Sequence, residues 1–209
     1  DQVPVTWRSD ESVAAAVDRT DDVRGAEAVV TIADDTVTKR RVPKSYRHPS
    51  LDERLRRERT VEEARLTHDA RTEGVPTPVV RDVDLASHTL VFEYVGASDL
   101  RDALTARRVR DVGEHLAALH GAGIVHGDPT TRNVRVDGPR TYLIDFGLGY
   151  YSRDVEDHAM DLHVFEQSLG GTADDPAEMV AAVEAAYRDA GDEAVLDQLR
   201  AIEGRGRYQ

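Results

Sequence analysis

The chain has 209 residues, a formal net charge of −13 at pH 7 and no cysteine. This length allows one large core or two small lobes that share a cleft. The negative charge argues against free-standing nucleic-acid binding, because attraction to phosphate supplies most of that affinity, so contact with RNA is expected to be local or through a partner. The lack of cysteine excludes disulfides and thiolate metal sites and favours an intracellular setting.

The sequence indicates neither a membrane span nor a signal peptide. No apolar run approaches the ~20 residues that a span needs, and the N-terminus has no signal-peptide pattern. We therefore expect a cytoplasmic protein.

Lysine is almost absent from the chain. Lys39 and Lys44 are the only two, whereas arginine and aspartate are plentiful. An acidic surface that is poor in lysine suits high salt, where charge repulsion is screened within ~3 Å at 1 M. We therefore expect a halophilic source, and we expect at least one of the two retained lysines to be needed for function.

The chain is expected to divide into three parts. Residues 1–22 have no clear period and are interpreted as a linker or N-terminal extension. Residues 23–95 are expected to form a small lobe rich in strands, and residues 96–209 a helical lobe with a short basic tail. The first residue is Asp rather than Met, which indicates a processed end or a segment of a longer polypeptide.

A hairpin and one long helix are predicted for the small lobe. Residues 26–41 alternate loosely around a turn at residues 34–35, which places Lys39 on the second strand. The helix is expected to start at a capping box formed by residues 50–53 and to end at Gly74.

Three glutamates interrupt the apolar stripe of this helix. Glu58, Glu62 and Glu63 fall where apolar residues are expected, and a carboxylate on the inward face of a helix needs a cationic partner. The pattern separates the candidates poorly. We choose Glu63 as the partner of Lys39, with Glu58 as the runner-up.

The rest of the chain is predicted to change from strands to helices. Residues 75–95 are typical of short strands, with residues 90–95 as a buried run closed by Gly96. A helix is then predicted to begin at Ser98 or Asp99 and to stop near Gly121. Three more helices are predicted, at about residues 155–169, from residue 175 onward and at about residues 192–203.

Two motifs indicate the chemistry of the predicted site. Asp128 and Asn133 form a D-x-x-x-x-N pattern, and Asp145 begins a D-F-G motif. Phosphoryl transfer from Mg-ATP needs one carboxylate to orient or deprotonate the attacking group, and an amide and a second carboxylate to bind the metal. We therefore predict Asp128 as the catalytic residue and Asn133 and Asp145 as magnesium ligands. The plainer alternatives are turn caps for Asp128 and Asn133.

The spacing of these motifs predicts that the two metal ligands converge. Residues 134–139 and 142–144 are expected to form a hairpin around an Asp-Gly turn. Asn133 precedes this hairpin and Asp145 follows it. Because antiparallel strands bring their ends together, both side chains are expected near one metal ion.

The small lobe supplies the other predicted nucleotide contacts. Lys39 is expected to contact the α and β phosphates, held in place by Glu63; a solvated strand lysine is the alternative. The backbone of Glu93-Tyr94-Val95 is expected to bind the adenine edge, with Phe92 at the back of the pocket, although an ordinary buried strand has the same pattern. Gly25 is a weak candidate for a phosphate-covering loop, because a G-x-G-x-x-G motif is absent.

The histidines do not indicate a second metal site. His115, His120, His158 and His163 lack a carboxylate or cysteine spacing that supports zinc, so we interpret them as surface or core residues. The basic tail near residues 200–207 is interpreted either as a functional segment or as a solvated end.

A specific combination of short motifs extends across the chain. These motifs are Tyr46-Arg47-His48-Pro49, Arg57-Glu58-Arg59-Thr60, Glu63-Ala64-Arg65, His126-Gly127-Asp128, Thr130-Thr131, Asn133, Asp145-Phe146-Gly147-Leu148-Gly149-Tyr150-Tyr151-Ser152, Glu156-Asp157, Asp161 and Arg205-Gly206-Arg207. The combination closely resembles the small atypical kinase/ATPase subunit of the KEOPS complex, over about residues 25–208. RIO kinases and aminoglycoside phosphotransferases share its H-x-D and D-F-G motifs but not the whole set.

The resemblance implies an α+β, two-lobe protein-kinase-like fold. It implies a small antiparallel β N-lobe with one main helix, a helical C-lobe and a minimal activation segment between Gly147 and Val155, which makes a peptide-substrate platform doubtful. It also implies ATP and Mg²⁺ as cofactors, autophosphorylation on serine or threonine, and an ATPase role in forming N6-threonylcarbamoyladenosine at position 37 of tRNA. The implied partners are the KEOPS threonylcarbamoyl-transferase subunit, a small regulatory subunit, and tRNA only through the complex.

The opening segment resembles the C-terminal end of that transferase subunit, which some archaea fuse to the kinase. An archaeal source and a place as the kinase half of such a fusion follow from this resemblance. The chain departs from the family at Pro129, where an apolar residue is usual, and in placing Arg40 and Arg41 next to Lys39.

Two other functions are compatible with the motifs. One is a small-molecule phosphotransferase of the aminoglycoside-kinase type, which would normally need additional helices for an acceptor pocket. The other, a non-catalytic nucleotide-binding scaffold, ranks last because all the catalytic groups are present. The sequence leaves open whether the acceptor is water, the protein itself or another protein.

Overall fold

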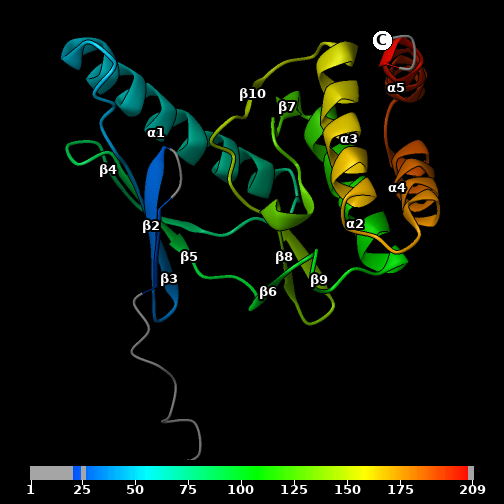
Figure 1. The fold of residues 1–209 in the computed structure, drawn as a ribbon, viewed down its shortest axis with the longest axis horizontal. Coiled ribbons are helices and arrows are strands. Elements are labelled where there is room, and N and C mark those ends of the chain that lie inside the picture. The colour runs from blue at the N-terminus through cyan, green and yellow to red at the C-terminus, as the bar shows by residue number, and fades with distance from the viewer. Residues whose placement is uncertain (1–20, 25–26, 207–209) are drawn as a thin grey trace, which may run out of the picture.

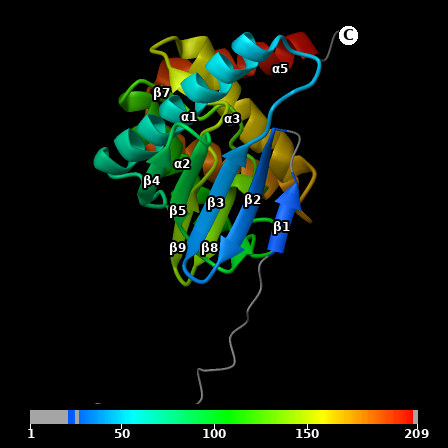
Figure 2. The same cartoon turned by 90° about the vertical axis from the view of Figure 1, so that its left-hand side faces the viewer.

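A five-stranded antiparallel sheet forms one of the two lobes (Figures 1 and 2). The computed structural model describes residues 21–24 and 27–206, and the sheet has the order β1-β2-β3-β5-β4. Its strands are β1 (Asp21–Arg24), β2 (Ala28–Ala33), β3 (Thr36–Arg41), β4 (Val80–Asp84) and β5 (Thr89–Glu93). The expected linker at residues 1–22 lies almost wholly outside the described residues, as do Gly25 and Arg207.

The predicted hairpin is formed by β2 and β3. Asp34 takes a positive φ of 52° in the turn, a conformation that Asp tolerates better than most residues. Lys39 lies on β3 between Val30 of β2 and Leu90 of β5, as expected. The run at residues 90–95 is not buried throughout, because strand side chains alternate between two faces and only Leu90 and Phe92 are buried.

The long helix α1 (Pro49–Thr72) packs beside this sheet (Figure 1). The predicted capping box is wrong: the N-cap residue is His48, and Ser50 lies inside the helix, where its hydroxyl bonds His48 Nδ1 at 2.9 Å. Pro49 explains the earlier start, since its fixed φ suits the first helical position. The predicted end is confirmed, because Gly74 follows the helix with a φ of 86°.

The second lobe is mainly helical and begins later than predicted. Ser98 and Asp99 do not start a helix but form the short strand β6 (Ser98–Asp99), which pairs with β8. The helix α2 (Ala106–Gly121) starts after Thr105, whose side chain accepts a hydrogen bond from the Arg108 N–H. Strand pairing and this later cap together override the cap that the sequence indicates at residue 98 or 99.

Short strands and three more helices complete the second lobe. The core between the helices is apolar and includes Leu116, Phe165 and Tyr187, each with no measurable exposure. Within the described residues, no helix is long and apolar enough to cross a membrane. The elements are β7 (Ile124–Val125), the 3₁₀ turn η1 (Thr131–Asn133), β8 (Val134–Asp137), β9 (Arg140–Leu143), β10 (Tyr150–Tyr151), α3 (Val155–Gly170), α4 (Pro176–Ala190) and α5 (Glu193–Gly206).

Candidate active site

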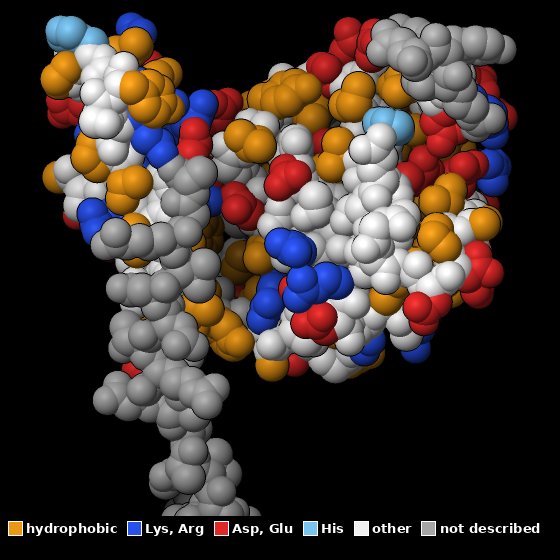
Figure 3. All heavy atoms as spheres, viewed as in Figure 1, with side chains coloured by type: hydrophobic (Ala, Val, Ile, Leu, Met, Phe, Trp, Pro, Cys, Tyr) orange, Lys and Arg blue, Asp and Glu red, His pale blue; other side chains and the backbone are white. Residues whose placement is uncertain are grey.

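A cavity of about 180 Å³ lies between the two lobes, and the face in Figure 3 is hollowed in this region. Apolar side chains of the sheet line most of it, together with Ile144, which follows β9. Three charged side chains stand at one end: Lys39 from β3, Glu63 from α1, and Asp145 just after β9. The cavity therefore combines an apolar slot with an ionic end.

Lys39 joins the two lobes through two short ion pairs. Its Nζ atom lies 2.7 Å from Glu63 Oε1 and 2.7 Å from Asp145 Oδ1. Glu58, the runner-up, points away: its side chain is 60% exposed and lies 3.8 Å from Arg54. The geometry thus favours Glu63 as the partner of Lys39, because only the side chain of Glu63 is buried beside it.

Arg41 also binds Glu63, which sequence reasoning missed. Its Nη2 atom lies 2.5 Å from Glu63 Oε2, and the two side chains are 5% and 1% exposed. Each oxygen of the buried carboxylate therefore has its own cation. The period-two spacing of Lys39 and Arg41 on one strand was the available signal, since it places both on the same face of the sheet.

The charges stabilise one another. Burial disfavours the charged form of Lys39, but Glu63 and Asp145 outweigh it and raise the lysine pKa. Burial likewise disfavours ionised Asp145, yet the nearby charge and hydrogen bond of Lys39 hold its pKa below the usual value. Both groups are therefore ionised at neutral pH.

Asp128 and Asn133 are also in contact. The Asn133 amide donates to the Asp128 carbonyl and to Asp128 Oδ2, each at 2.9 Å. These two hydrogen bonds connect the two ends of the segment from Asp128 to Asn133. Burial raises the pKa of Asp128 despite this hydrogen bond and the nearby His126. A carboxylate with a raised pKa is a stronger base than a free aspartate.

His126 connects this loop to the D-F-G segment. It is fully buried, and burial lowers its pKa, so the ring is neutral. Its Nε2 lies 3.0 Å from the Ile144 carbonyl, and its Nδ1 accepts from the Asp128 N–H at 3.3 Å. The protonated nitrogen is therefore Nε2, because a carbonyl can only accept.

Asp161 of α3 holds the loop that carries His126 and Asp128 in place. Its two carboxylate oxygens accept from the backbone N–H groups of His126 at 2.6 Å and Gly127 at 2.8 Å. Gly127 has a φ of 84°, and a Cβ there would lie 2.3 Å from the Leu148 carbonyl oxygen, so only glycine fits. In the sequence, Asp161 was part of a motif but had no assigned role. Its burial on α3 and its contacts with the loop identify it as a positioning residue.

The β8–β9 hairpin brings the predicted metal ligands to the same end. Val134 pairs with Leu143, and the Ile144 N–H donates to the Asn133 carbonyl at 2.9 Å. Asp145 takes a φ of 64°, and its side chain is 48% exposed toward the cavity. Carboxylate and amide oxygens of this kind fit Mg²⁺, which prefers hard oxygen ligands.

The predicted adenine-binding segment lines the opposite end of the cavity. Phe92, Tyr94 and Val95 are all part of its wall. The Glu93 N–H donates to the Val79 carbonyl and the Tyr94 N–H to the Asp35 carbonyl. Of the three backbone donors proposed, Val95 is therefore the one left for a base. Gly25, the proposed phosphate cover, lies outside the described residues.

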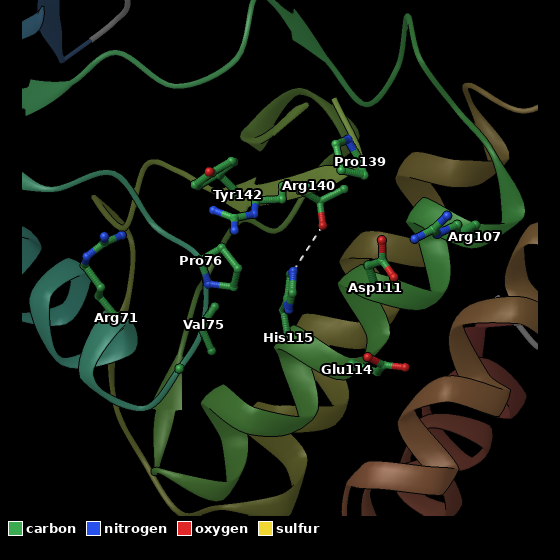
Figure 4. A pocket seen from close by; sticks show the side chains of 12 residues that line it. Arg71, Val75, Pro76, Arg107, Asp111, Glu114, His115, Pro139, Arg140 and Tyr142 are labelled. Carbon is green, nitrogen blue, oxygen red and sulfur yellow. Dashed lines mark hydrogen bonds between the residues drawn. The ribbon is translucent and has the colours of Figure 1, made fainter. Parts of the chain in front are cut away.

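A larger cavity, of about 610 Å³, lies away from these motifs (Figure 4). It is lined by the end of α1, the start of α2 and the β8–β9 hairpin. His115 lies at its edge and bonds the Thr141 hydroxyl at 3.0 Å. Arg107 and Arg140 line it together with Asp111 and Glu114, so no single charge dominates. We place the active site in the smaller cavity because the predicted phosphate-handling groups line it.

No model of a known protein family matches the chain, but curated relatives do. It is 64% identical over 211 residues to a "Probable bifunctional tRNA threonylcarbamoyladenosine biosynthesis protein" of Natronomonas pharaonis, and 63% identical over 210 residues to the protein of that name in Halobacterium salinarum. The chain is homologous to part of these bifunctional proteins. All of the chain is matched, but it spans only 40% of the length of each relative.

Solved structures identify the fold as kinase-like. A choline/ethanolamine kinase family protein from Mesorhizobium loti matches with a TM-score of 0.61 and 17% identity, covering 93% of this chain and 81% of that one. Rio2 kinase from Chaetomium thermophilum, in an ADP/Mg²⁺-phosphoaspartate complex, matches with a TM-score of 0.59 and 17% identity, covering 91% and 71%. The predicted two-lobe kinase-like fold is confirmed; at these identities the likeness concerns the fold alone.

Proposed function

We propose that this chain is a Mg-ATP-dependent phosphotransferase or ATPase of the atypical serine/threonine kinase type. The observation that carries the proposal is the ion-paired series Glu63, Lys39 and Asp145 at the end of the inter-lobe cavity. Asp128 and Asn133 precede the β8–β9 hairpin and Asp145 follows it, so Asn133 and Asp145 lie at the same open end of the hairpin. These are the groups that phosphoryl transfer requires.

Each side chain then has a defined task. Lys39 binds the phosphates and Glu63 keeps it in position, while the Val95 backbone and Phe92 receive the base. Asn133 and Asp145 would hold magnesium, which when bound neutralises phosphate charge. Asp128 accepts the proton of the attacking hydroxyl or water, helped by its raised pKa.

We further propose that this activity supports N6-threonylcarbamoyladenosine formation on tRNA within a KEOPS-type assembly. The name of the Natronomonas pharaonis relative, which is 64% identical to the chain, supports that pathway. A threonylcarbamoyl-transferase unit is the main proposed partner, with a small regulatory subunit as the second. The net charge of −13 supports contact with tRNA only through the complex.

Loss of ATP turnover on removing either carboxylate would test the site. We expect Asp128→Ala and Asp145→Ala to lower the rate at least about a hundredfold, measured at high salt with the transferase partner. Asp137→Ala is the matched control, because Asp137 is an exposed aspartate on the same hairpin. Circular dichroism and urea unfolding would verify that each variant is folded.

Several outcomes would contradict the proposal or redirect it. Wild-type turnover in both variants would rule out the assigned site. Turnover without dependence on partner or tRNA would count against the KEOPS role but not against the site. Phosphorylation of a small acceptor from a panel would instead favour the small-molecule phosphotransferase.

A further inference from the structure

A second group of ionisable side chains lies between α3 and α5, away from the inter-lobe cavity. The two helices pack against each other within the C-terminal lobe (Figure 1). His163 and Glu166 come from α3 and Glu203 from α5. Each contributes one possible ligand atom, and these three atoms lie within 4.8 Å of one another. One small ion could therefore contact all three.

Glu166 differs from the other buried carboxylates of the structure because none of the described residues forms a hydrogen bond with it. It is 6% exposed, and neither carboxylate oxygen has a hydrogen bond within the described part of the chain. Glu63 and Asp161, in contrast, use both of their oxygens. The buried Nδ1 atom of His163 likewise has no hydrogen-bond partner among the residues that the structure describes. Native proteins rarely leave such groups unsatisfied, so this arrangement calls for a missing partner.

The carboxylates around this group indicate the charge of that partner. Glu184 and Glu203 both lie close enough to Glu166 to act on it electrostatically. No arginine or lysine forms an ion pair with Glu166 or Glu203 in the described residues. A positive ion would satisfy the open oxygens and offset the concentration of negative charge.

We propose that His163, Glu166 and Glu203 form a binding site for a zinc ion. An imidazole nitrogen and two carboxylate oxygens are zinc ligands, and a water would complete a tetrahedral set. Magnesium is disfavoured, because it prefers oxygen ligands and keeps most of its waters. The ion would tie the C-terminal helix to α3, so its role would be structural rather than catalytic.

The proposed site gives His163 a role that differs from its interpretation as a surface or core residue. His163 and Glu166 are separated by one helical turn and face the same side of α3. The third candidate ligand, Glu203, belongs to a different helix, so its approach could not be read from local spacing.

Zinc titration of the purified chain tests the site. The protein would carry no histidine tag, would be stripped with EDTA, and would contain Asp145→Asn so that the ATP site contributes little binding. Competition with a chromophoric chelator should show one zinc ion per chain. We expect Glu203→Gln and His163→Ala to weaken binding at least tenfold. Glu193→Gln, an exposed glutamate on α5, and His68→Ala, an exposed histidine on α1, should leave it unchanged.

A second readout distinguishes zinc from a general effect of divalent ions. Zinc should raise the thermal unfolding midpoint of the chain with an intact cluster but not the midpoint of Glu203→Gln. Magnesium at the same concentration should not raise the midpoint of either protein. Absence of zinc binding to the wild-type cluster, or equal binding by all four variants, would overturn the proposal. Should a cluster variant fail to fold, the stoichiometry of the intact chain alone decides.

Discussion

At the scale of single residues, Glu63 is the most constrained group in the candidate site. It is 1% exposed, and its two oxygens hold Lys39 and Arg41 separately. A buried carboxylate with a single cation would leave one oxygen poorly satisfied. Arg41 therefore completes the set of partners of Glu63, whose other oxygen holds Lys39 beside Asp145.

Removing Arg41 should destabilise the protein through this carboxylate. We expect Arg41→Ala to lower the free energy of unfolding by roughly 3 kcal/mol, because it breaks a buried ion pair. Arg40→Ala is the matched control: the neighbouring arginine is exposed, so its loss should change stability by about 0.5 kcal/mol or less. Urea unfolding at constant salt measures both. Equal effects of the two substitutions would contradict the role given to Arg41.

The sequence indicated some candidate site residues and gave no sign of others. Asp128, Asn133 and Asp145 could be proposed because their roles depend on spacing within one segment. Glu63 was also chosen over Glu58 from the sequence, although the pattern separated the two poorly; in the structure Glu63 is buried beside Lys39, whereas Glu58 is exposed. Asp161 was overlooked as an anchor because its contacts, to backbone N–H groups of another segment, leave no local pattern.

At the scale of elements, the type of each element was easier to predict than its start. The β2–β3 and β8–β9 hairpins were predicted from alternation and turn residues. Two predicted helix starts were wrong. Ser50 and Ser98 both have side chains that can cap a helix, but in the structure neither residue lies at a helix start. Ser50 follows Pro49 into the helix, and Ser98 pairs with Val136 of β8. Local propensity cannot distinguish such competing partners.

The cap observed at Thr105 can be tested against the cap expected at Ser50. Thr105→Ala should reduce the free energy of unfolding by about 1 kcal/mol, because its hydroxyl accepts from the Arg108 N–H at the start of α2. Ser50→Ala should cost less than about 0.5 kcal/mol, since its hydroxyl caps no backbone group. Chemical denaturation of both variants gives the comparison. A larger loss at Ser50 would restore the predicted capping box.

At the scale of the whole molecule, the two-lobe arrangement followed from the motifs rather than from periodicity. Hydrophobic patterns indicated strands and then helices, which many α+β folds share. The H-x-D and D-F-G motifs selected the kinase-like fold, and the solved structures agree. The interaction of α3 with the loop that carries Asp128, and with α5, could not be predicted, because it depends on how distant segments pack.

Three histidines, two of them buried and one half-buried, should make the stability of the whole molecule sensitive to mild acid. Burial lowers the pKa values of His115, His120 and His126, so these rings stay neutral in the folded state. The unfolded chain takes up their protons below about pH 6.5. Their contribution to stability is therefore complete above that pH and is lost as pH falls through the folded pKa values.

A single substitution isolates this effect from that of the carboxylates. His115 is half-buried, bonds Thr141, and has Asp111 as the nearby charge that favours its protonation. Between pH 7.5 and 5.5 the free energy of unfolding should fall by up to about 1.4 kcal/mol more for the wild type than for His115→Gln. The reason is that the wild-type chain gains a proton at His115 when it unfolds, whereas the glutamine variant has no imidazole at this position. His68→Gln, at an exposed histidine of α1, should keep the wild-type slope. Urea unfolding at both pH values and fixed salt measures the difference, and parallel pH curves for wild type and His115→Gln would show that His115 does not exclude a proton in the folded state.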